Sequence, residues 1–215
     1  MKHAAALLLL LSAEVGTAPA PLSTPIVHVI PREREFLDDT RVYEATLPSG
    51  AYSIRRDSSI RRLVVNGLDA RETLTFDPSY RIYTLFALTV DQDLVVFYEA
   101  SNDLESTGSI VRLDGRTLTV KWVATGPSMN IAPPVVCEDS LCAAGHGSVV
   151  RVVLATGRIA WSHYDLYEQL HAFNAPEGLV VANGSLIVHE SLASYDHRES
   201  KTMVFNLTTG EYSVK

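Results

Sequence analysis

The sequence predicts an all-β protein built from repeated units of four short antiparallel strands. Three observations support this prediction: an internal repeat of about 40–50 residues, polar or glycine turns at regular spacing, and runs of β-branched side chains between the turns. The 215-residue chain is 47% hydrophobic and 20% charged, an ordinary balance for a globular domain or repeat array. Its formal net charge of −7, without a long basic run, gives no support to nucleic-acid binding.

The clearest repeat is a strand pair that ends in tryptophan. Residues 108–122 begin Gly-Ser-Ile-Val-Arg and end at Trp122, and residues 147–161 begin Gly-Ser-Val-Val-Arg and end at Trp161. The two copies have the same length and align without a gap. In the second copy Thr156-Gly157 supplies the turn, because glycine accepts a positive φ without steric cost. A self-match at this period is typical of repeat architectures.

A third copy of the same turn lies near the C-terminus. Leu207-Thr-Thr-Gly210 matches the Leu-Ala-Thr-Gly sequence of residues 154–157, and Val214 stands where the earlier copies have tryptophan. Each strand pair follows a hairpin of constant form, with a two-residue polar turn and a leucine at one fixed position. These hairpins are residues 90–96, 137–143 and 182–188. One unit therefore holds four strands.

The N-terminal segment, residues 1–40, has a different composition from the rest. Residues 1–20 have the order of a secretory signal peptide: a basic start at Lys2, an apolar run over 4–11 and small residues up to Ala20, with cleavage after Thr17 as the alternative. The apolar run is shorter than the roughly 20 residues that span a bilayer. Residues 21–40 are rich in proline and charge and are interpreted as a linker or extended arm.

The repeats are expected over residues 41–215. Before the clear repeats, strands are predicted over 42–47, 51–54 and 62–65, with Asn66-Gly67 as a hairpin signal. We expect no transmembrane segment and a secreted, extracellular or lumenal location, or the periplasm if the source is bacterial.

The residues of the second copy resemble a known repeat. Residues 132–136, 141–147 and 149–161 are similar to the quinoprotein-like (PQQ-type, WD40-like) β-propeller repeat, which runs proline-valine, hairpin turn, strand, glycine, strand, Asp/Ala-Thr-Gly turn, tryptophan. The resemblance is specific over 84–161, fair over 176–215 and weak before 80.

The resemblance implies that each unit is a propeller blade. It also implies that Trp122 and Trp161, with Gly157 and Gly210, close adjacent blades. About 195 residues follow the signal peptide, which gives a β-propeller-like array of about four to five four-stranded antiparallel blades. Either the propeller is small or the set of blades is incomplete.

Cys137 and Cys142 are the two cysteines of the chain. A secretory compartment favours a disulfide between them. If Glu138-Asp139 is a two-residue turn, however, Cys142 lies diagonally from Cys137, about 7–8 Å away and at the limit for a disulfide. A disulfide and two reduced core thiols both remain open, and nothing nearby indicates a redox-active pair.

Two further features bear on surface chemistry. Asn183-Gly-Ser and Asn206-Leu-Thr are N-glycosylation acceptors by rule if the host is eukaryotic. Tyr164, Tyr167 and His171 share one face of a possible short helix, which predicts either a partner-binding patch or ordinary packing. None of the seven histidines has metal-ligand spacing, and the sequence indicates no catalytic, cofactor-binding or metal-binding residue.

Taken together, these features favour an exported, non-enzymatic binding or scaffold propeller that contacts a protein or glycan partner. One alternative is a fragment whose blades belong to a larger propeller. The other is a degenerate pyrroloquinoline-quinone dehydrogenase, for which the chain is short and lacks the adjacent cysteines that the resemblance implies for the enzymes of that family. Fold-level analogy alone does not choose between these functions.

Overall fold

A computed structural model describes residues 27–29, 42–47, 50–57, 62–66, 71–75, 81–102, 104–129, 131–166, 176–190 and 201–215. This part of the chain contains seventeen β-strands, and all their pairings are antiparallel. The all-β prediction is therefore confirmed.

The strands form four sheets, which we number along the chain. The first sheet contains β2 (Val42–Leu47), β3 (Gly50–Asp57), β4 (Arg62–Asn66) and β5 (Arg71–Thr75). The second contains β1 (Val27–Val29), β6 (Arg81–Val90), β7 (Asp93–Ser101), β8 (Ser106–Leu113) and β9 (Val120–Gly126). The third contains β10 (Val135–Cys137), β11 (Ser140–Gly145), β12 (Ser148–Val153) and β13 (Ile159–His163). The fourth contains β14 (Pro176–Ala182), β15 (Ser185–Glu190), β16 (Thr202–Asn206) and β17 (Tyr212–Val214).

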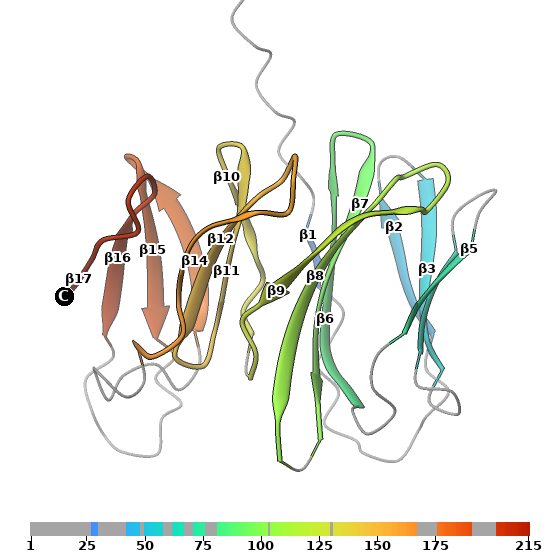
Figure 1. Ribbon diagram of the computed structural model, residues 1–215, viewed down its shortest axis with the longest axis horizontal. Coiled ribbons are helices and arrows are strands. Elements are labelled where there is room, and N and C mark those ends of the chain that lie inside the picture. The colour runs from blue at the N-terminus through green and yellow to red at the C-terminus, as the bar shows by residue number, and fades with distance from the viewer. Residues whose placement is uncertain are drawn as a thin grey trace, which may run out of the picture.

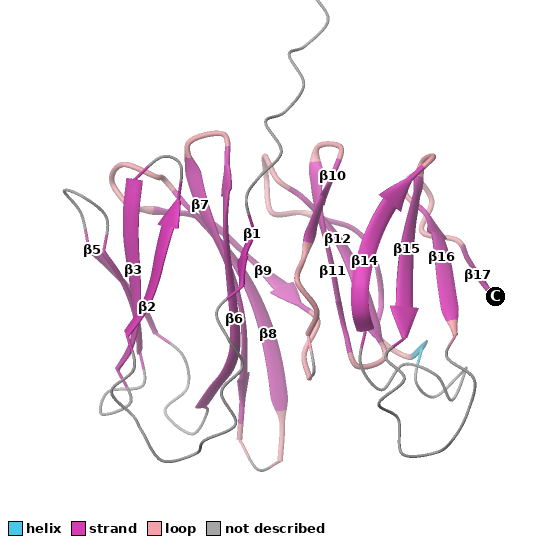
Figure 2. Ribbon diagram, turned by 180° about the vertical axis from the view of Figure 1, so that it is seen from behind, coloured by secondary structure: helices cyan, strands magenta, loops and turns pink. Residues whose placement is uncertain are grey.

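The four sheets stand side by side in a row, in the order of the chain (Figures 1 and 2). The first and fourth sheets lie at opposite ends of the row, so the described strands do not close into a ring. In each sheet the neighbouring strands are consecutive in sequence, apart from β1, which joins the second sheet beside β6.

The hairpin turns follow from backbone sterics. In the second, third and fourth sheets the strands β6–β7, β10–β11 and β14–β15 are joined by two residues, and the first of the two has a positive φ. These residues are Asp91, Glu138 and Asn183, with φ of 57°, 57° and 50°. Asp and Asn tolerate this region better than most side chains, and two-residue hairpins require it. The polar turns predicted from the sequence therefore lie where expected.

One N-terminal expectation differs from the structure, and the predicted arm contains a short strand. Asn66 is the last residue of β4 and pairs with Arg71, so Asn66-Gly67 does not form a two-residue turn. Residues 67–70 lie outside the described residues. Val27–Val29, within the segment interpreted as a linker or arm, forms β1 and pairs with β6. The valines at both ends of β1 favour this pairing, because β-branched residues suit a strand.

Buried apolar side chains lie between each pair of neighbouring sheets. One cluster of buried side chains joins Leu74 of the first sheet to residues of the second. A second cluster lies between the second and third sheets and includes Phe97 and Val150. A third lies between the third and fourth sheets and includes Val149 and Phe205. The second and third sheets therefore bury both faces, as alternate residues of a strand point to opposite sides.

Candidate functional site at the seams between sheets

Two seams share one arrangement of residues: the middle seam between the second and third sheets, and the C-terminal seam between the third and fourth. In the middle seam Trp122 Nε1 donates a 2.8 Å hydrogen bond to the Leu154 carbonyl oxygen of the third sheet. In the C-terminal seam Trp161 Nε1 donates a 2.8 Å bond to the Leu207 carbonyl oxygen of the fourth. Both indoles are partly buried and pack against the core clusters. Each tryptophan therefore joins its own sheet to a turn of the next.

A glycine lies beneath each indole. A Cβ atom on Gly157 would stand 2.7 Å from the Trp122 ring, and one on Gly210 would stand 2.8 Å from the Trp161 ring. Both glycines also have a left-handed φ, 72° and 77°. The close approach of the indole ring and the left-handed backbone conformation thus both require glycine at these two positions.

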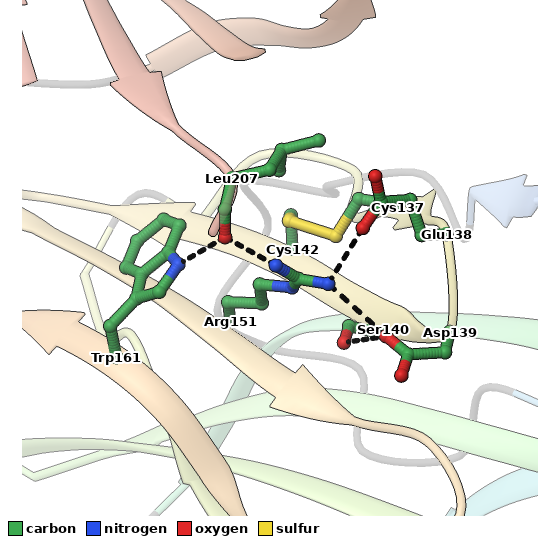
Figure 3. Close-up of a disulfide and its surroundings, with 8 residues drawn as sticks. All are labelled: Cys137, Glu138, Asp139, Ser140, Cys142, Arg151, Trp161 and Leu207. Carbon is green, nitrogen blue, oxygen red and sulfur yellow. Dashed lines mark hydrogen bonds and ion pairs between the residues drawn. A yellow bond between two sulfur atoms is a disulfide. The ribbon is translucent and has the colours of Figure 1, made fainter. Parts of the chain in front are cut away.

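An arginine donates to the same carbonyl as each tryptophan. Arg112 Nη1 donates to the Leu154 oxygen at 2.7 Å, and Arg151 Nη1 donates to the Leu207 oxygen. Figure 3 shows Arg151 and Trp161 converging on Leu207 from two strands of the third sheet. A carbonyl oxygen has two lone pairs, so it accepts both donors.

The other end of each guanidinium meets carboxylates at a hairpin tip. Arg151 Nη2 lies 3.0 Å from a Glu138 oxygen and 3.1 Å from an Asp139 oxygen (Figure 3). The Ser140 hydroxyl also donates to Asp139, and this bond, followed by the hydrogen bond from Arg151 and then its charge, lowers the pKa of that carboxyl. Arg151 is buried while both carboxylates are exposed, so the guanidinium links a solvent-facing tip to the interior.

The middle seam has a larger set of charges. Arg112 Nε donates to the buried Asp93 at 2.6 Å, and Arg112 Nη2 lies 3.4 Å from Asp91. Lys121 Nζ lies 2.7 Å from Asp93 and 3.3 Å from Asp114, and the bond to Asp93 raises the pKa of that ammonium group. Two cations thus compensate the buried carboxylate of Asp93, as a buried charge requires.

The fourth sheet has neither the arginine nor the tryptophan on its outward face, the face turned away from the third sheet. β8–β9 and β12–β13 each contain an irregularity that sets arginine opposite tryptophan. β16–β17 has regular pairing, with Val204 opposite Ser213. The sequence placed Val214 in the tryptophan position. That placement is wrong by one residue. β17 lacks the extra residue that β9 and β13 contain, so Val214 pairs with Met203 and not with Val204.

The seam between the first and second sheets uses a leucine instead of an indole. Leu118 occupies the turn position of Gly157 and Gly210 and also has a positive φ, 58°. Its side chain is fully buried in a cluster with Leu74 and Ile82. Both tryptophans of the chain belong to later seams, and Leu118 provides apolar contact at this one.

The cysteines form a disulfide within the C-terminal seam. Their Cα atoms are 6.1 Å apart, within the usual range. Cys137 pairs with Ser140 and Cys142 with Val135, so the two-residue turn and the diagonal geometry both occur. The Cα atoms of this diagonal pair are closer than the roughly 7–8 Å typical of diagonal neighbours, so the disulfide forms. Both residues are fully buried against the fourth sheet.

Four rings form an aromatic cluster beside this disulfide. Trp161 stacks on Phe205 with centroids 5.7 Å apart, and His163 meets Tyr212 edge-on at 5.2 Å. His163 Nε2 lies 2.9 Å from the Gly210 carbonyl oxygen. The cluster joins β13 to β16 and β17, and aromatic pairs of this kind add to area burial.

The expected aromatic patch is described only in part. Tyr164 is 51% exposed, and the backbone N–H of Leu166 donates to the Gly147 oxygen at 3.0 Å. Tyr167 and His171 lie outside the described residues. Asn183 lies at the β14–β15 tip and Asn206 ends β16.

The described part of the chain contains no group of three or more His, Cys, Asp or Glu residues placed to hold a metal ion. It also contains no helix with the length and hydrophobicity needed to cross a membrane. Neither a protein-family model nor a curated protein matches the chain.

The sequence repeat contains both arginines but does not by itself predict their role. Arg112 and Arg151 occupy the same position in the two copies of the repeat, and this shared position was the one indication of a common role. Their acidic partners come from the preceding hairpin and their carbonyl partner comes from the next sheet, so no short motif contains the whole set. The arrangement fixes sheets to one another.

Proposed function

We propose that this chain is an exported, non-enzymatic binding or scaffold protein whose sheets are blades of a β-propeller-like array. The observation that carries the proposal is the repeated seam, in which arginine and tryptophan of one sheet hold a turn of the next. Seams of this kind keep successive hairpins in a fixed arrangement. Rigidly spaced loops suit recognition of a partner.

The disulfide supports the exported route, because such bonds persist in oxidising compartments. The signal-peptide pattern of residues 1–20 supports it independently. The partner is a protein or a glycan, and the exposed Tyr164 next to the C-terminal seam is a suitable contact, since aromatic side chains are enriched at interfaces.

The test is affinity capture with the mature chain, using two matched surface variants. Tyr164→Ser removes the exposed aromatic ring, whereas Val123→Ser removes an exposed aliphatic side chain from β9. We expect one partner to be recovered at fixed stoichiometry, lost with Tyr164→Ser and retained with Val123→Ser. Recovery of no partner above background contradicts the proposal.

A second candidate is that these sheets belong to a larger propeller. It is favoured by the outward face of the fourth sheet, where Val180, Ile187 and Val204 form one cross-strand apolar row. The native mass and melting of residues 21–215 distinguish the two. A monodisperse species with a cooperative melt supports an independent domain, and aggregation supports the larger assembly.

A further inference from the structure

The two Asn-x-Ser/Thr sequences, which are well separated in the chain, meet at one end of the fourth sheet. Asn183 opens the two-residue turn between β14 and β15, and Asn206 is the last residue of β16. Ser185, which completes the first sequence, is the cross-strand partner of Asn206. The Leu207 backbone N–H donates to the Gly184 oxygen at 3.0 Å, which joins the two turns.

Asn183 occupies a position that binds arginine in the two preceding sheets. Its equivalents there are Asp91 and Glu138, and each forms an ion pair with the arginine of its own sheet. In the fourth sheet that arginine is replaced by Val204. The acid and its cation have therefore both been replaced, and an uncharged carboxamide stands at the tip of the hairpin.

Asn206 is exposed and its carboxamide is oriented by its own turn. Its Oδ1 accepts the backbone N–H groups of Thr208 at 2.9 Å and Thr209 at 3.0 Å. Nδ2 is thereby left on the far side of the amide from the turn. Phe205 points into the core, so Asn206 lies on the opposite face, which is turned away from the third sheet.

We propose that Asn183 and Asn206 are N-glycosylation sites that carry a pair of adjacent oligosaccharides at the end of the fourth sheet. The donor is a lipid-linked oligosaccharide diphosphate. Nδ2 of the asparagine forms a bond to C1 of the first sugar, the C1–O bond to the diphosphate breaks, the lipid diphosphate leaves and Nδ2 loses one proton. This inference rests on the exported route of the proposed function, because the reaction occurs after entry into the secretory pathway.

A glycan on Asn206 has a consequence for the outward face of the fourth sheet. Val204 lies on the same strand with one residue between it and Asn206, and hence on the same face, about 7 Å away. Stacked sheets are about 10 Å apart, a space that side chains fill. An oligosaccharide at Asn206 and a further sheet stacked on the apolar row of Val180, Ile187 and Val204 therefore exclude each other.

The experiment is translation of the full chain in the presence of eukaryotic microsomes, with two separate readouts. Protection from added protease reports entry into the vesicles. Removal of a mobility shift by a peptide N-glycosidase, an amidase that hydrolyses the bond between the asparagine side chain and the first sugar, with mass-spectrometric detection of the resulting Asn-to-Asp conversion in heavy-oxygen water, reports glycosylation at each site. We expect two glycan steps in the parent chain, with conversion at both Asn183 and Asn206.

Matched variants assign each step. Asn183→Gln should lose one step. Thr208→Ala should lose the other while leaving the Asn206 side chain in place, and Thr208→Ser should retain it, because serine also completes the sequence. A chain that is protected from protease but shows no shift overturns this inference and leaves export intact. If the chain is not protected, the exported route fails. The same full chain preceded by a second, known signal sequence then decides the sites, and a protected but unshifted product there overturns them.

Discussion

The indole of each seam tryptophan acts in two ways that substitution can separate. The ring covers a glycine of the neighbouring turn, and Nε1 donates to a leucine carbonyl earlier in that turn. Ring burial contributes through apolar area, whereas the hydrogen bond contributes about 1 kcal/mol. The ring should therefore account for most of the stabilisation.

We expect Trp122→Ala and Trp161→Ala each to lower the free energy of unfolding by about 3 kcal/mol, as for other large aromatic truncations. For a chain of this size this lowers the thermal midpoint by about 6–12 °C. Trp→Phe at either site retains most of the ring area, loses the N–H donor and should cost about 1 kcal/mol. Thermal unfolding followed by circular dichroism measures this. Midpoints of both alanine variants within a degree or two of the parent contradict it.

Asp114 offers a test of pH dependence at one side chain. The backbone N–H of Thr117 is the main cause that lowers the Asp114 pKa from 3.8 to about 2, followed by the N–H of Arg116, the Thr117 hydroxyl and Lys121. The pKa is lower in the folded state, so the stabilisation is fully present above about pH 4 and is lost as the pH falls towards 2.

Asp114→Asn is the matched variant, because Asn206 makes the same two backbone contacts in the fourth sheet. We expect the parent to have the higher thermal midpoint at pH 6 and the two midpoints to converge near pH 2. Asp114→Ala should be less stable than both at pH 6, since it lacks an acceptor for the turn. A difference between parent and Asp114→Asn that does not change from pH 6 to pH 2 contradicts the assigned cause.

At the scale of the element, the disulfide closes a short loop within a single hairpin. Cys137 and Cys142 have a sequence separation of 5, so the bond restricts the unfolded chain by only about 2 kcal/mol in the loop-entropy account. Both residues also pack in the C-terminal seam. The effect of the disulfide bond on the unfolded chain and the effect of the two side chains on packing can therefore be measured separately.

Reduction of the parent should lower the free energy of unfolding by about 2 kcal/mol. Cys137→Ala/Cys142→Ala should lower it further, because two buried sulfur atoms are lost from the seam, and it should be insensitive to reductant. Urea unfolding with and without reductant, with thiol labelling to verify reduction, provides the measurement. An unchanged urea midpoint in a fully reduced parent contradicts the expected contribution.

The strands were more accessible to sequence reasoning than the seams. Alternation, β-branched runs and polar two-residue turns are local, and they predicted the hairpins around Asp91, Glu138 and Asn183. An irregularity of one residue is not encoded in that alternation, so the register of Val214 was missed. The arginine contacts were missed because they join three segments distant in sequence.

At the scale of the whole molecule, the sheets differ in how many of their faces are buried against a neighbouring sheet. The second and third sheets are covered on both faces, whereas the fourth is covered by the third on one face alone among the described residues. Its other face has no arginine–tryptophan pair to hold a neighbour. Local stability depends on buried apolar contacts, so it should fall towards the C-terminal end of the row.

We therefore expect backbone amides of β16 to exchange with solvent faster than those of β12. The comparison is matched, because each strand is the third of its sheet and is paired on both edges, β12 with β11 and β13, β16 with β15 and β17. Because both strands have a partner on each edge, we attribute the expected difference mainly to packing between sheets. Hydrogen–deuterium exchange with peptide-resolved mass spectrometry makes the measurement. Protection of β16 equal to that of β12 would show that the outward face of the fourth sheet is covered in solution.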